Sequence, residues 1–386
     1  MKILSVFGTR PEAIKMAPVL RALAAEPGVD SRVCVTGQHR QMIAPLLDFF
    51  GVAPDADLGL MRPGQSLNGL VSGALWALDE VLEALRPDRV LVHGDTSTAM
   101  AAALAAFHRR IPVGHVEAGL RTYDSGHPFP EEMNRRIVDL ASDLMFAPTA
   151  RSAANLAAEA LEGRVLVTGN TVIDTLHWAT ARLDADHALR AKVDAGLPRI
   201  SPGHRLVLVT GHRRENFGDG MANICAALLG LSRMDRTQIV YPVHLNPNVQ
   251  GPVTEALAGQ PNIHLIPPQD YVAFLRLMQR ADVILTDSGG VQEEAPALGK
   301  PVLVMRDTTE RPEALASGAV SLVGTDAERI LSATLGHLER LDLGGRGPAP
   351  VSPYGDGRAA ARIVDAVVGR EVIPFAPSAP PTLRAA

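Results

Sequence analysis

Short apolar runs alternate with longer helical stretches along the whole chain. In the first half, each apolar run has the length of a strand and is followed by turn or polar residues and then usually by a helical pattern. The strands predicted there are Lys2–Phe7, Arg32–Thr36, Arg89–Val92, Pro112–Val116, Leu144–Phe146 and Val165–Val167. Such alternation is typical of βαβ units and a parallel sheet.

The pattern restarts after a loop rich in proline around residues 197–203. The strands predicted in this second half are Leu206–Val209, Gln238–Val243, Ile263–Ile266, Val283–Leu285, Val302–Val304 and Val320–Val323. A chain of 386 residues is longer than a single hydrophobic core usually accommodates, which favours two domains. We therefore expect an α/β fold with two Rossmann-like, doubly wound domains facing a cleft, made of residues 1–169 and 170–356.

The end of the chain changes in character. Residues Gly344–Pro350 are rich in glycine and proline and predict a loop. A helical pattern follows over 357–368, and we expect this helix to pack back on the first domain. The segment 374–386 is rich in proline and predicts a disordered tail.

Composition and charge narrow the classes of partner. The chain is 46% hydrophobic and 20% charged, which is ordinary for a globular protein. A formal charge of −5 gives no reason to expect binding to nucleic acid or to an anionic membrane, so any anionic ligand must be held by local basic residues. The start, MKILSVFGTRPEA, turns polar too soon for a signal peptide, and no run has the ~18 apolar residues of a membrane helix.

Cysteine usage points to a reducing compartment. The chain has only two cysteines, Cys34 in a predicted strand and Cys225 in a predicted helix, and we expect both to be core residues. A disulfide framework is excluded and a cytoplasmic location is favoured.

Polar residues follow the first two predicted strands. In FGTRPEAIKMAP, Pro11 suits the first position of a helix, so Arg10 and Lys15 lie around a helix N-terminus and predict an anion site. The alternative is a solvated pair of basic side chains. In TGQHRQM, Gln38 and Gln41 lie just past the second strand, as binding residues or as ordinary turn residues.

Carboxylates gather after the next strands. Asp95 in LVHGDTSTAM and Glu117 in GHVEAGLRT each follow a strand of one predicted sheet, and Glu131 in PFPEEMNRR opens a helix. Helix capping and dipole effects are the alternative explanation. Clustered carboxylates raise one another's pKa values and can exchange protons near neutral pH, so we favour a catalytic cluster. Three arginines could hold this cluster or a phosphate: Arg121, Arg135 and Arg136.

The second half carries basic and glycine-rich signals at its strand ends. His212 lies beside two arginines in VTGHRRENFG, and His244 occupies the same place on the next strand, which suits phosphate binding. In LTDSGGVQEEAPALGKP a strand ends at Asp287, and a Ser-Gly-Gly turn leads into a helix. Such a turn lets backbone N–H groups approach a pyrophosphate, and Glu294 one turn later suits a ribose diol. The alternative is a capped helix after a tight turn.

Motifs for cofactors are missing from the sequence. No G-x-G-x-x-G follows a predicted strand, LGKP lacks the pattern of a P-loop, and there is no zinc-ligand spacing and no nucleophile elbow. We therefore expect no cofactor and no metal.

The longer motifs together resemble one known family. They are GTRPEAIKMAP, TGQHRQM, HGDTST, GHVEAGLRT, PFPEEMNR, VTGNTVIDT, GHRRENFG, YPVHLNPNV, DSGGVQEEAPALGKPVLVMRDTTERPEA and YGDG. From Lys2 to about Val368 the chain resembles the non-hydrolysing UDP-N-acetylglucosamine 2-epimerases. The resemblance implies a glycosyltransferase-B type fold, a homodimer, and reversible conversion of UDP-N-acetylglucosamine to UDP-N-acetylmannosamine for cell-envelope polysaccharides.

The resemblance also implies roles for individual residues. The family's catalytic positions correspond to Asp95, Glu117, Glu131 and His212. Its UDP-binding positions correspond to Arg10, Lys15, Gln269, Phe274, Ser288, Gly289, Gly290, Glu294 and Arg311. A regulatory site for a second substrate molecule, present in many bacterial members, corresponds to Gln38, Gln41, Glu132, Arg213 and His244. We expect Glu117 and Glu131 to act as acid and base, without assigning which one takes the C2 proton. Asp95 would support the intermediate, and His212 would steady the UDP leaving group.

Other activities fit parts of the pattern. A glycosyltransferase of the same fold would have a similar phosphate loop, and a hydrolysing 2-epimerase would release the free sugar and UDP. A UDP-2,3-diacetamido-glucuronate could replace the substrate, and a catalytically silent sugar-nucleotide regulator is a further class. The filled catalytic positions favour the epimerase.

Overall fold

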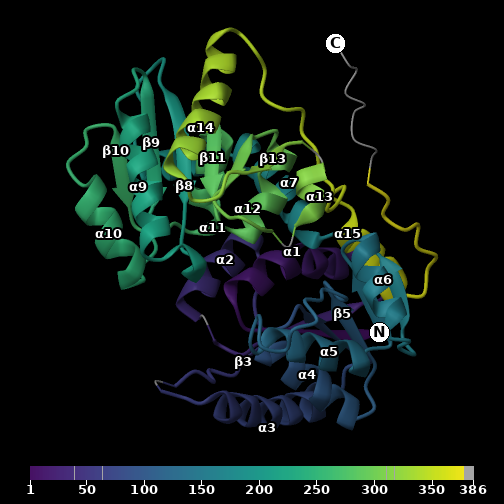
Figure 1. The fold of residues 1–386 in the computed structure, drawn as a ribbon. Coiled ribbons are helices and arrows are strands. Elements are labelled where there is room, and N and C mark those ends of the chain that lie inside the picture. The colour runs from purple at the N-terminus through teal and green to yellow at the C-terminus, as the bar shows by residue number, and fades with distance from the viewer. Residues whose placement is uncertain (39, 63, 310, 317, 378–386) are drawn as a thin grey trace. The chain divides into compact units, whose positions relative to one another are not determined.

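The computed structural model describes residues 1–38, 40–62, 64–309, 311–316 and 318–377 (Figure 1). Side chains of residues 39–42 lie outside this description. The chain forms two compact units. The N-terminal unit contains Met1–Trp178 and Tyr354–Pro377, and the C-terminal unit contains Ala179–Pro353. The boundary falls within helix α7 (Thr171–Ala185), between Trp178 and Ala179, whereas the sequence suggested a boundary between residues 169 and 170.

The N-terminal unit is built on a seven-stranded sheet in the order β3-β2-β1-β4-β5-β6-β7. All neighbouring pairs are parallel. The strands are β1 (Lys2–Phe7), β2 (Asp30–Val35), β3 (Ala56–Asp57), β4 (Arg89–His93), β5 (Val113–Val116), β6 (Leu144–Ala147) and β7 (Arg164–Val167). Strands that are buried on both faces are apolar throughout, which is why these runs could be recognised in the sequence.

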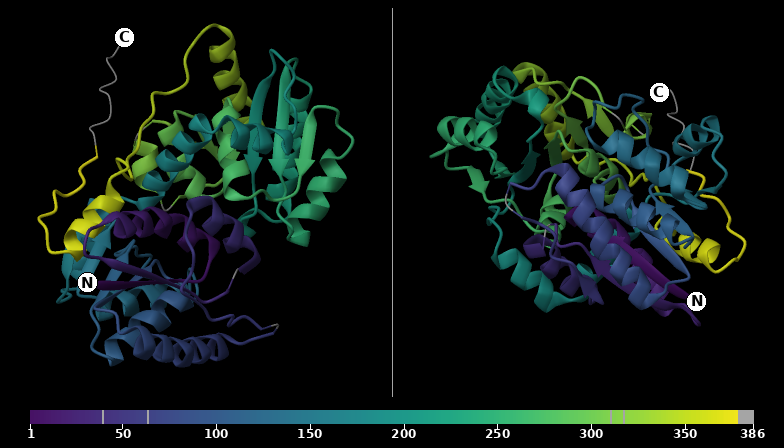
Figure 2. Two further views of the ribbon diagram at one scale, coloured as in Figure 1. Left: turned by 180° about the vertical axis from the view of Figure 1, so that it is seen from behind. Right: turned by 90° about the horizontal axis from the view of Figure 1, so that it is seen from below.

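Helices flank this sheet. They are α1 (Arg10–Ala25), α2 (Arg40–Phe50), α3 (Leu67–Leu85), α4 (Ser97–His108), α5 (Glu131–Ala141), α6 (Ala150–Ala158), the start of α7, and α15 (Ala359–Val367). Helix α4 packs between α3 and α5, and α1 packs against α2 and α15 (Figures 1 and 2). The alanines of α4 are almost fully buried against β1, β4 and α3, and their small side chains let the helix lie close to its neighbours.

The C-terminal unit repeats this plan with a six-stranded parallel sheet in the order β10-β9-β8-β11-β12-β13. Its strands are β8 (Arg205–Thr210), β9 (Thr237–Pro242), β10 (Ile263–Ile266), β11 (Val283–Thr286), β12 (Val302–Val304) and β13 (Val320–Leu322). Its α-helices are α8 (His187–Ala195), α9 (Asp219–Ser232), α10 (Pro247–Leu257), α11 (Tyr271–Arg280), α12 (Gly289–Glu294), α13 (Pro312–Ala316) and α14 (Ala327–Asp342). Short 3₁₀ turns follow β8 (Arg214–Asn216) and α12 (Pro296–Leu298).

Both sheets have the 3-2-1-4-5-6 strand order of doubly wound folds. The predicted α/β class with two Rossmann-like sheets is confirmed. Every predicted strand is present within two residues of its expected ends, whereas the short edge strand β3 was missed. Cys34 and Cys225 are buried core residues, as expected, and burial raises the pKa of their thiols to about 12 and about 11.

The C-terminal segment differs from the prediction of a tail that is disordered from residue 374. Phe375 is only 6% exposed, and its N–H donates to the Val167 carbonyl at 2.8 Å. An apolar ring that can be buried beside β7 is enough to hold this part of the chain. Residues 378–386 lie outside the described structure. No described helix is long and apolar enough to cross a membrane.

Candidate active site

Two of the predicted carboxylates lie at one edge of the N-terminal sheet. Strands β4 and β5 are parallel neighbours, with His93 paired to Val116 in the register. Both strands therefore end together, and Asp95 and Glu117 follow at the carboxyl edge, where α/β proteins bind ligands. Glu117 has φ +67°, a left-handed conformation that non-glycine residues rarely adopt. Strain of this kind is concentrated at functional sites.

Glu117 is held by groups from three other elements. Lys15 of α1 donates to its Oε1, and the side-chain amide of Asn170, just before α7, donates to the same oxygen at 2.9 Å. His93 at the end of β4 places Nε2 3.6 Å from Oε2. Burial lowers the pKa of His93 to about 3, against the pull of the Glu117 charge, so this imidazole is neutral. Lys15, which the sequence predicted to bind an anion, forms an ion pair with the Glu117 carboxylate in this structure.

Glu12 organises the turn after β1. Its Oε2 accepts the N–H groups of Gly8 and Thr9 at 3.0 and 2.7 Å, and its Oε1 accepts the Thr96 hydroxyl at 2.7 Å. Burial raises the pKa of Glu12, although these hydrogen bonds act in the opposite direction. The sequence interpretation missed this residue. The signal for it was present, because Thr9 and Glu12 form a capping box.

Asp95 and Glu132 are both held by Arg135. The guanidinium of Arg135 donates to Asp95 Oδ2 and lies 3.3 Å from Glu132 Oε2. Glu132 also accepts the N–H groups of Thr122 and Tyr123, each at 3.0 Å, and is 1% exposed. Glu131 is the first residue of α5 and is half-buried.

A buried chain of alternating charges lies behind this edge. Each ring nitrogen of His115 is hydrogen-bonded. Nδ1 lies 2.6 Å from Asp139 Oδ1, and Nε2 lies 2.8 Å from the Gly94 carbonyl oxygen. Arg121 pairs with Asp139 at 2.7 Å and with Glu159 at 2.7 Å. Burial acts to raise the pKa of Asp139, but interactions with His115 and Arg121 outweigh burial and lower this pKa. Arg121 thus serves this chain, and of the three arginines singled out in the sequence Arg135 is the one that reaches Asp95.

In the C-terminal unit, a second constellation forms where β8 and β11 end. Asp287 is fully buried, and its Oδ2 accepts the N–H groups of His212 and Arg213 at 2.8 Å. His212 places Nδ1 3.4 Å from Asp287 Oδ1, and its ring stacks on that of His244 with 5.4 Å between centroids. Burial lowers the pKa of His212, and Arg213 and His244 add to this, while Asp287 opposes it.

The glycines of the predicted Ser-Gly-Gly turn, Gly289 and Gly290, are the first two residues of α12, so the helix begins earlier than the sequence suggested. Ser288 is the N-cap residue, but its side chain makes no capping bond, so capping does not explain the choice of serine here. Glu294 accepts the Tyr271 hydroxyl at 3.0 Å and is 8% exposed. Arg311 donates to Glu293 at 2.5 Å.

The other predicted binding and regulatory residues lie at α1, around α11 and after β2. Arg10 is the first residue of α1, and Phe274 is half-buried on α11. Gln269 donates to the Pro267 carbonyl at 2.6 Å. Gln38 accepts the Thr98 hydroxyl at 3.5 Å, whereas the side chain of Gln41 lies outside the described residues.

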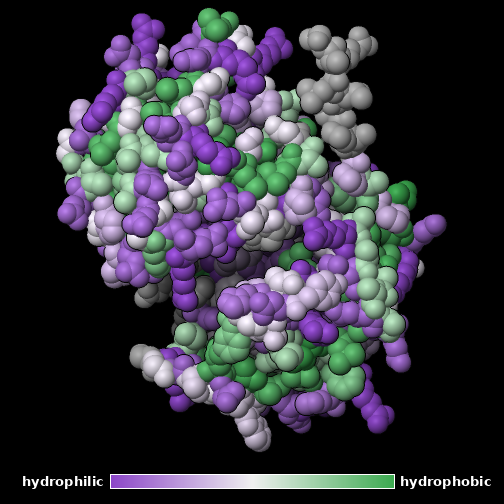
Figure 3. Space-filling view, viewed as in Figure 1, coloured by the Kyte–Doolittle hydropathy of each residue, from purple (hydrophilic) through white to green (hydrophobic). Residues whose placement is uncertain are grey.

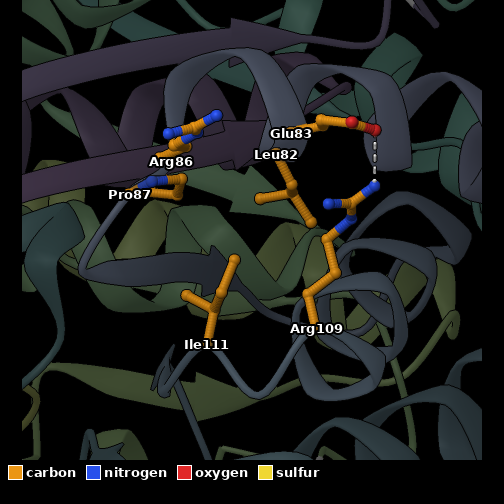
Figure 4. A pocket seen from close by; sticks show the side chains of 6 residues that line it. All are labelled: Leu82, Glu83, Arg86, Pro87, Arg109 and Ile111. Carbon is orange, nitrogen blue, oxygen red and sulfur yellow. Dashed lines mark hydrogen bonds and ion pairs between the residues drawn. The ribbon is translucent and has the colours of Figure 1, made fainter.

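One surface hollow of the N-terminal unit lies away from this site. A hollow of about 340 Å³ is lined by Leu82, Glu83, Arg86, Pro87, Arg109 and Ile111 (Figure 4). It lies where β4 and β5 begin, at the opposite end of the sheet from Asp95 and Glu117. Arg109 there is occupied by Glu83 at 3.1 Å and by Asp79. Among the described residues, no group of three His, Cys, Asp or Glu could hold a metal ion.

Comparison with known proteins identifies the family. A family model described as UDP-N-acetylglucosamine 2-epimerase matches residues 21–368. The UDP-N-acetylglucosamine 2-epimerase of Escherichia coli K12 is 50% identical, with 96% of this chain and 100% of that protein covered, and the one of Yersinia pestis is 52% identical over the same shares.

Solved structures agree. The crystal structure of the Neisseria meningitidis UDP-GlcNAc 2-epimerase bound to UDP-GlcNAc matches with a TM-score of 0.87 and 46% identity, and the match covers 95% of this chain and 100% of that one. The Listeria monocytogenes structure of a putative UDP-N-acetylglucosamine 2-epimerase matches with a TM-score of 0.84 at 42% identity, and 95% of each chain is covered. The chain belongs to the UDP-N-acetylglucosamine 2-epimerase family.

Proposed function

We propose that the protein epimerises UDP-N-acetylglucosamine at C2 to UDP-N-acetylmannosamine, reversibly and without net hydrolysis. The observation that carries this proposal is the N-terminal sheet edge, where Asp95 and Glu117 are each held by a cation from another element. Relatives with about half of their residues identical are named for this activity. The product would supply cell-envelope polysaccharides.

The chemistry favours elimination of UDP. The C2 proton is not next to a carbonyl and is only weakly acidic, and the sequence lacks the fingerprint of a nicotinamide site that oxidation would need. In elimination, the C1–O bond to UDP breaks, a carboxylate takes the C2 proton, and a glycal with a C1=C2 double bond forms. The second carboxylic acid then adds a proton to the other face of C2 while a phosphate oxygen of UDP attacks C1. Carboxylates near C1 and C2 and a stabilised leaving group are what this sequence requires.

Residues of both units have roles in this proposal. Glu117 and Glu131 act as acid and base at C2, and Asp95 supports the intermediate. His212 stabilises the departing UDP. The nucleotide is bound by Arg10, Lys15, Gln269, Phe274, Ser288, Gly289, Gly290, Glu294 and Arg311.

A second substrate molecule activates the enzyme in this proposal. The regulatory residues are Gln38, Gln41, Glu132, Arg213 and His244. Support comes from the stacking of His244 on His212, which connects a regulatory residue to a catalytic one. The Gln41→Ala variant should lose the sigmoidal dependence of rate on substrate concentration while keeping activity at saturation. An unchanged dependence would remove the regulatory role.

We extend the proposal to a homodimer formed through α3, α4 and α5. Trp76, Phe107 and Leu140 on these helices are 75%, 59% and 74% exposed, and hydrophobic residues gather over this part of the N-terminal unit (Figure 3). Exposed apolar surface of this kind marks interfaces. Light scattering should give a dimer for the wild type and a monomer for Trp76→Glu. Leu343→Glu, at an 89% exposed position of the C-terminal unit, is the control and should remain a dimer.

The decisive experiment is proton NMR of the purified protein with UDP-N-acetylglucosamine in deuterated water. The proposal requires a manno product and deuterium at C2 of both sugar nucleotides. Free N-acetylmannosamine and UDP would instead indicate the hydrolysing activity. If neither product forms, with UDP-N-acetylmannosamine tried as the substrate as well, the epimerase proposal is wrong and sugar acceptors should be screened for glycosyl transfer.

A further inference from the structure

Asp287 is a buried carboxylate whose two oxygens have different surroundings. It lies directly after β11 and is 0% exposed. Its Oδ2 accepts three donors: the backbone N–H groups of His212 and Arg213 at 2.8 Å and the Asn216 amide at 3.2 Å. Its Oδ1 is equally buried but has no hydrogen-bond partner among the described residues. An oxygen that accepts three N–H groups carries no hydrogen itself, and this geometry fits the ionised carboxylate.

The side-chain nitrogen that faces the unsatisfied oxygen belongs to His212. Its Nδ1 lies 3.4 Å from Oδ1. A buried carboxylate oxygen without a donor is costly, whereas a donor at Nδ1 would satisfy it. The hydrogen of a neutral imidazole therefore belongs on Nδ1, because a hydrogen on Nε2 would leave a lone pair of Nδ1 facing a negative charge.

We propose that Asp287 is a positioning residue that fixes the tautomer and orientation of His212, and so presents Nε2 of this histidine to the ligand. Two further contacts hold the ring. The bonds from Oδ2 fix the backbone of His212 itself, and the ring of His244 stacks on that of His212 at 19°. The carboxylate, the backbone and the stacked ring together leave the imidazole one favoured orientation.

This inference rests on the proposed function for its catalytic consequence. As UDP leaves C1, negative charge grows on the phosphate oxygen. When Nε2 takes up a proton from solvent as the anionic nucleotide binds, both ring nitrogens donate: Nδ1–H to Asp287, and Nε2–H to that oxygen. The Asp287 carboxylate compensates the charge of this imidazolium, in the way that an aspartate supports the histidine of a hydrolase triad.

The Asp287→Asn variant tests the assignment with little change in shape. The Asn carbonyl oxygen can replace Oδ2 and still accept the three donors, since only the oxygen of the amide accepts hydrogen bonds. The amide NH₂ then replaces Oδ1 and points hydrogens at Nδ1 of His212. The variant should therefore force the neutral ring into the Nε2–H tautomer.

The first readout is ¹⁵N NMR of the histidine rings in ¹⁵N-histidine-labelled protein, with the His212 signals identified by their loss in His212→Gln. We expect the Nδ1–H form in the wild type and the Nε2–H form in Asp287→Asn. The second readout is kinetic. We expect kcat to fall about 100-fold or more in Asp287→Asn, the range for loss of a positioned acid or base, and KM to change much less. Adding His212→Gln to Asp287→Asn should then lower kcat little further, because the two residues act as a unit.

Asp282→Asn is the matched control. Asp282 lies at the other end of the same strand, and its carboxylate accepts the Leu206 N–H at 2.8 Å and pairs with Arg205 at 3.2 Å. This variant removes a similar charge between β8 and β11, so it should keep the wild-type tautomer and kcat.

The two proposals can fail separately. An Nε2–H tautomer in the wild type overturns the inference without any variant, even if Asp287→Asn does not fold. A tautomer that stays Nδ1–H in Asp287→Asn overturns it as well. A wild-type protein that shows the Nδ1–H form but does not turn over UDP-N-acetylglucosamine supports the positioning of His212 and refutes the proposed function.

Discussion

Asp174 connects two distant helices of the N-terminal unit, and its charge should make stability depend on pH. It lies in the first turn of α7 and is 8% exposed. Its carboxylate accepts the N–H groups of Ala359 and Ala360 at 3.2 and 2.8 Å, and these residues begin α15. Burial raises the pKa of Asp174 from 3.8 to about 6; the two N–H groups act against this, and the nearby Asp356 adds to it.

Proton linkage gives the direction in which stability changes with pH. Between pH 4 and 6 the folded state holds a proton on Asp174 that the unfolded state has released, so the free energy of unfolding falls as pH rises through this window. The change is complete above the folded pKa. A shift of the Asp174 pKa from 3.8 to about 6 changes the free energy of unfolding by at most about 3 kcal/mol. Asp174→Asn cannot ionise but can still accept an N–H bond. The variant should therefore gain up to about 3 kcal/mol relative to the wild type between pH 4 and pH 7.5.

Tryptophan fluorescence suits the measurement, because both tryptophans of the chain, Trp76 and Trp178, lie in the N-terminal unit. Trp178 also lines a hollow of about 260 Å³ together with Asp174. Urea unfolding of both proteins at pH 4 and pH 7.5, at constant ionic strength, gives the difference directly and cancels other titrations. Asp88→Asn, which removes an exposed carboxylate that also accepts a backbone N–H, controls for the loss of one charge. Equal pH dependence for Asp174→Asn and the wild type would refute the reasoning.

Three further substitutions test other parts of the structure. Glu117→Gln should lower kcat by about 10² to 10⁴ in the epimerase assay and leave UDP binding measured by calorimetry nearly unchanged; a similar loss of UDP affinity would contradict a role in the chemical step. Arg121→Met removes the guanidinium that pairs with the fully buried Asp139, and urea unfolding should show a loss of about 3–5 kcal/mol, whereas a neutral result would mean that this buried ion pair is dispensable. Gly119→Ala places a Cβ 2.3 Å from the Ser152 carbonyl oxygen at φ +83° and should destabilise by more than about 1 kcal/mol, while Gly336→Ala on α14, with open space around it, should not destabilise.

The fold was predictable because both sheets are parallel and covered on both faces. Strands β1 and β8 are apolar at four of their six positions, and such a run can be recognised in the sequence without knowledge of its neighbours in the sheet. Strand β3 carries no such signal, since it has two residues at a sheet edge and pairs only with Cys34 and Val35. At Phe375 the sequence failed in the other way, because it predicted disorder where the chain is packed within the N-terminal unit. A proline-rich segment predicts disorder, but one buried ring and one hydrogen bond to Val167 are tertiary contacts that composition does not contain.

The candidate site was predictable where it depends on strand ends. Glu117 and Asp287 follow a strand directly, and Asp95 and His212 follow one after a single glycine. Within each sheet, parallel strands bring such positions to the same edge. Their partners were not predictable in this way. Lys15 and Glu117 are separated by 102 residues, and His115 and Asp139 by 24, so these pairs arise from packing of α1 and α5 against the sheet. Arg121 illustrates this, because the sequence left open whether it holds carboxylates or a phosphate, and its neighbours in space are the carboxylates of Asp139 and Glu159.

The partners matter because they orient the carboxylates before any ligand arrives. Glu117 has its Oε1 fixed by two donors, and Asp95 is fixed by Arg135. A catalytic group must keep within roughly 0.5 Å of its productive position, and such precision comes from the groups that hold it. In the proposed reaction, Glu117 and Glu131 remove a proton from one face of C2 and add one to the other while Asp95 supports the intermediate, so Glu117 and Asp95 have to stay in place until the second proton transfer is complete. In the proposed reaction, residues of the family motifs react with the substrate, and residues such as Asn170 and Asp287 hold them in orientation. A substitution at one of these supports should therefore change kcat even where the reacting residues are intact.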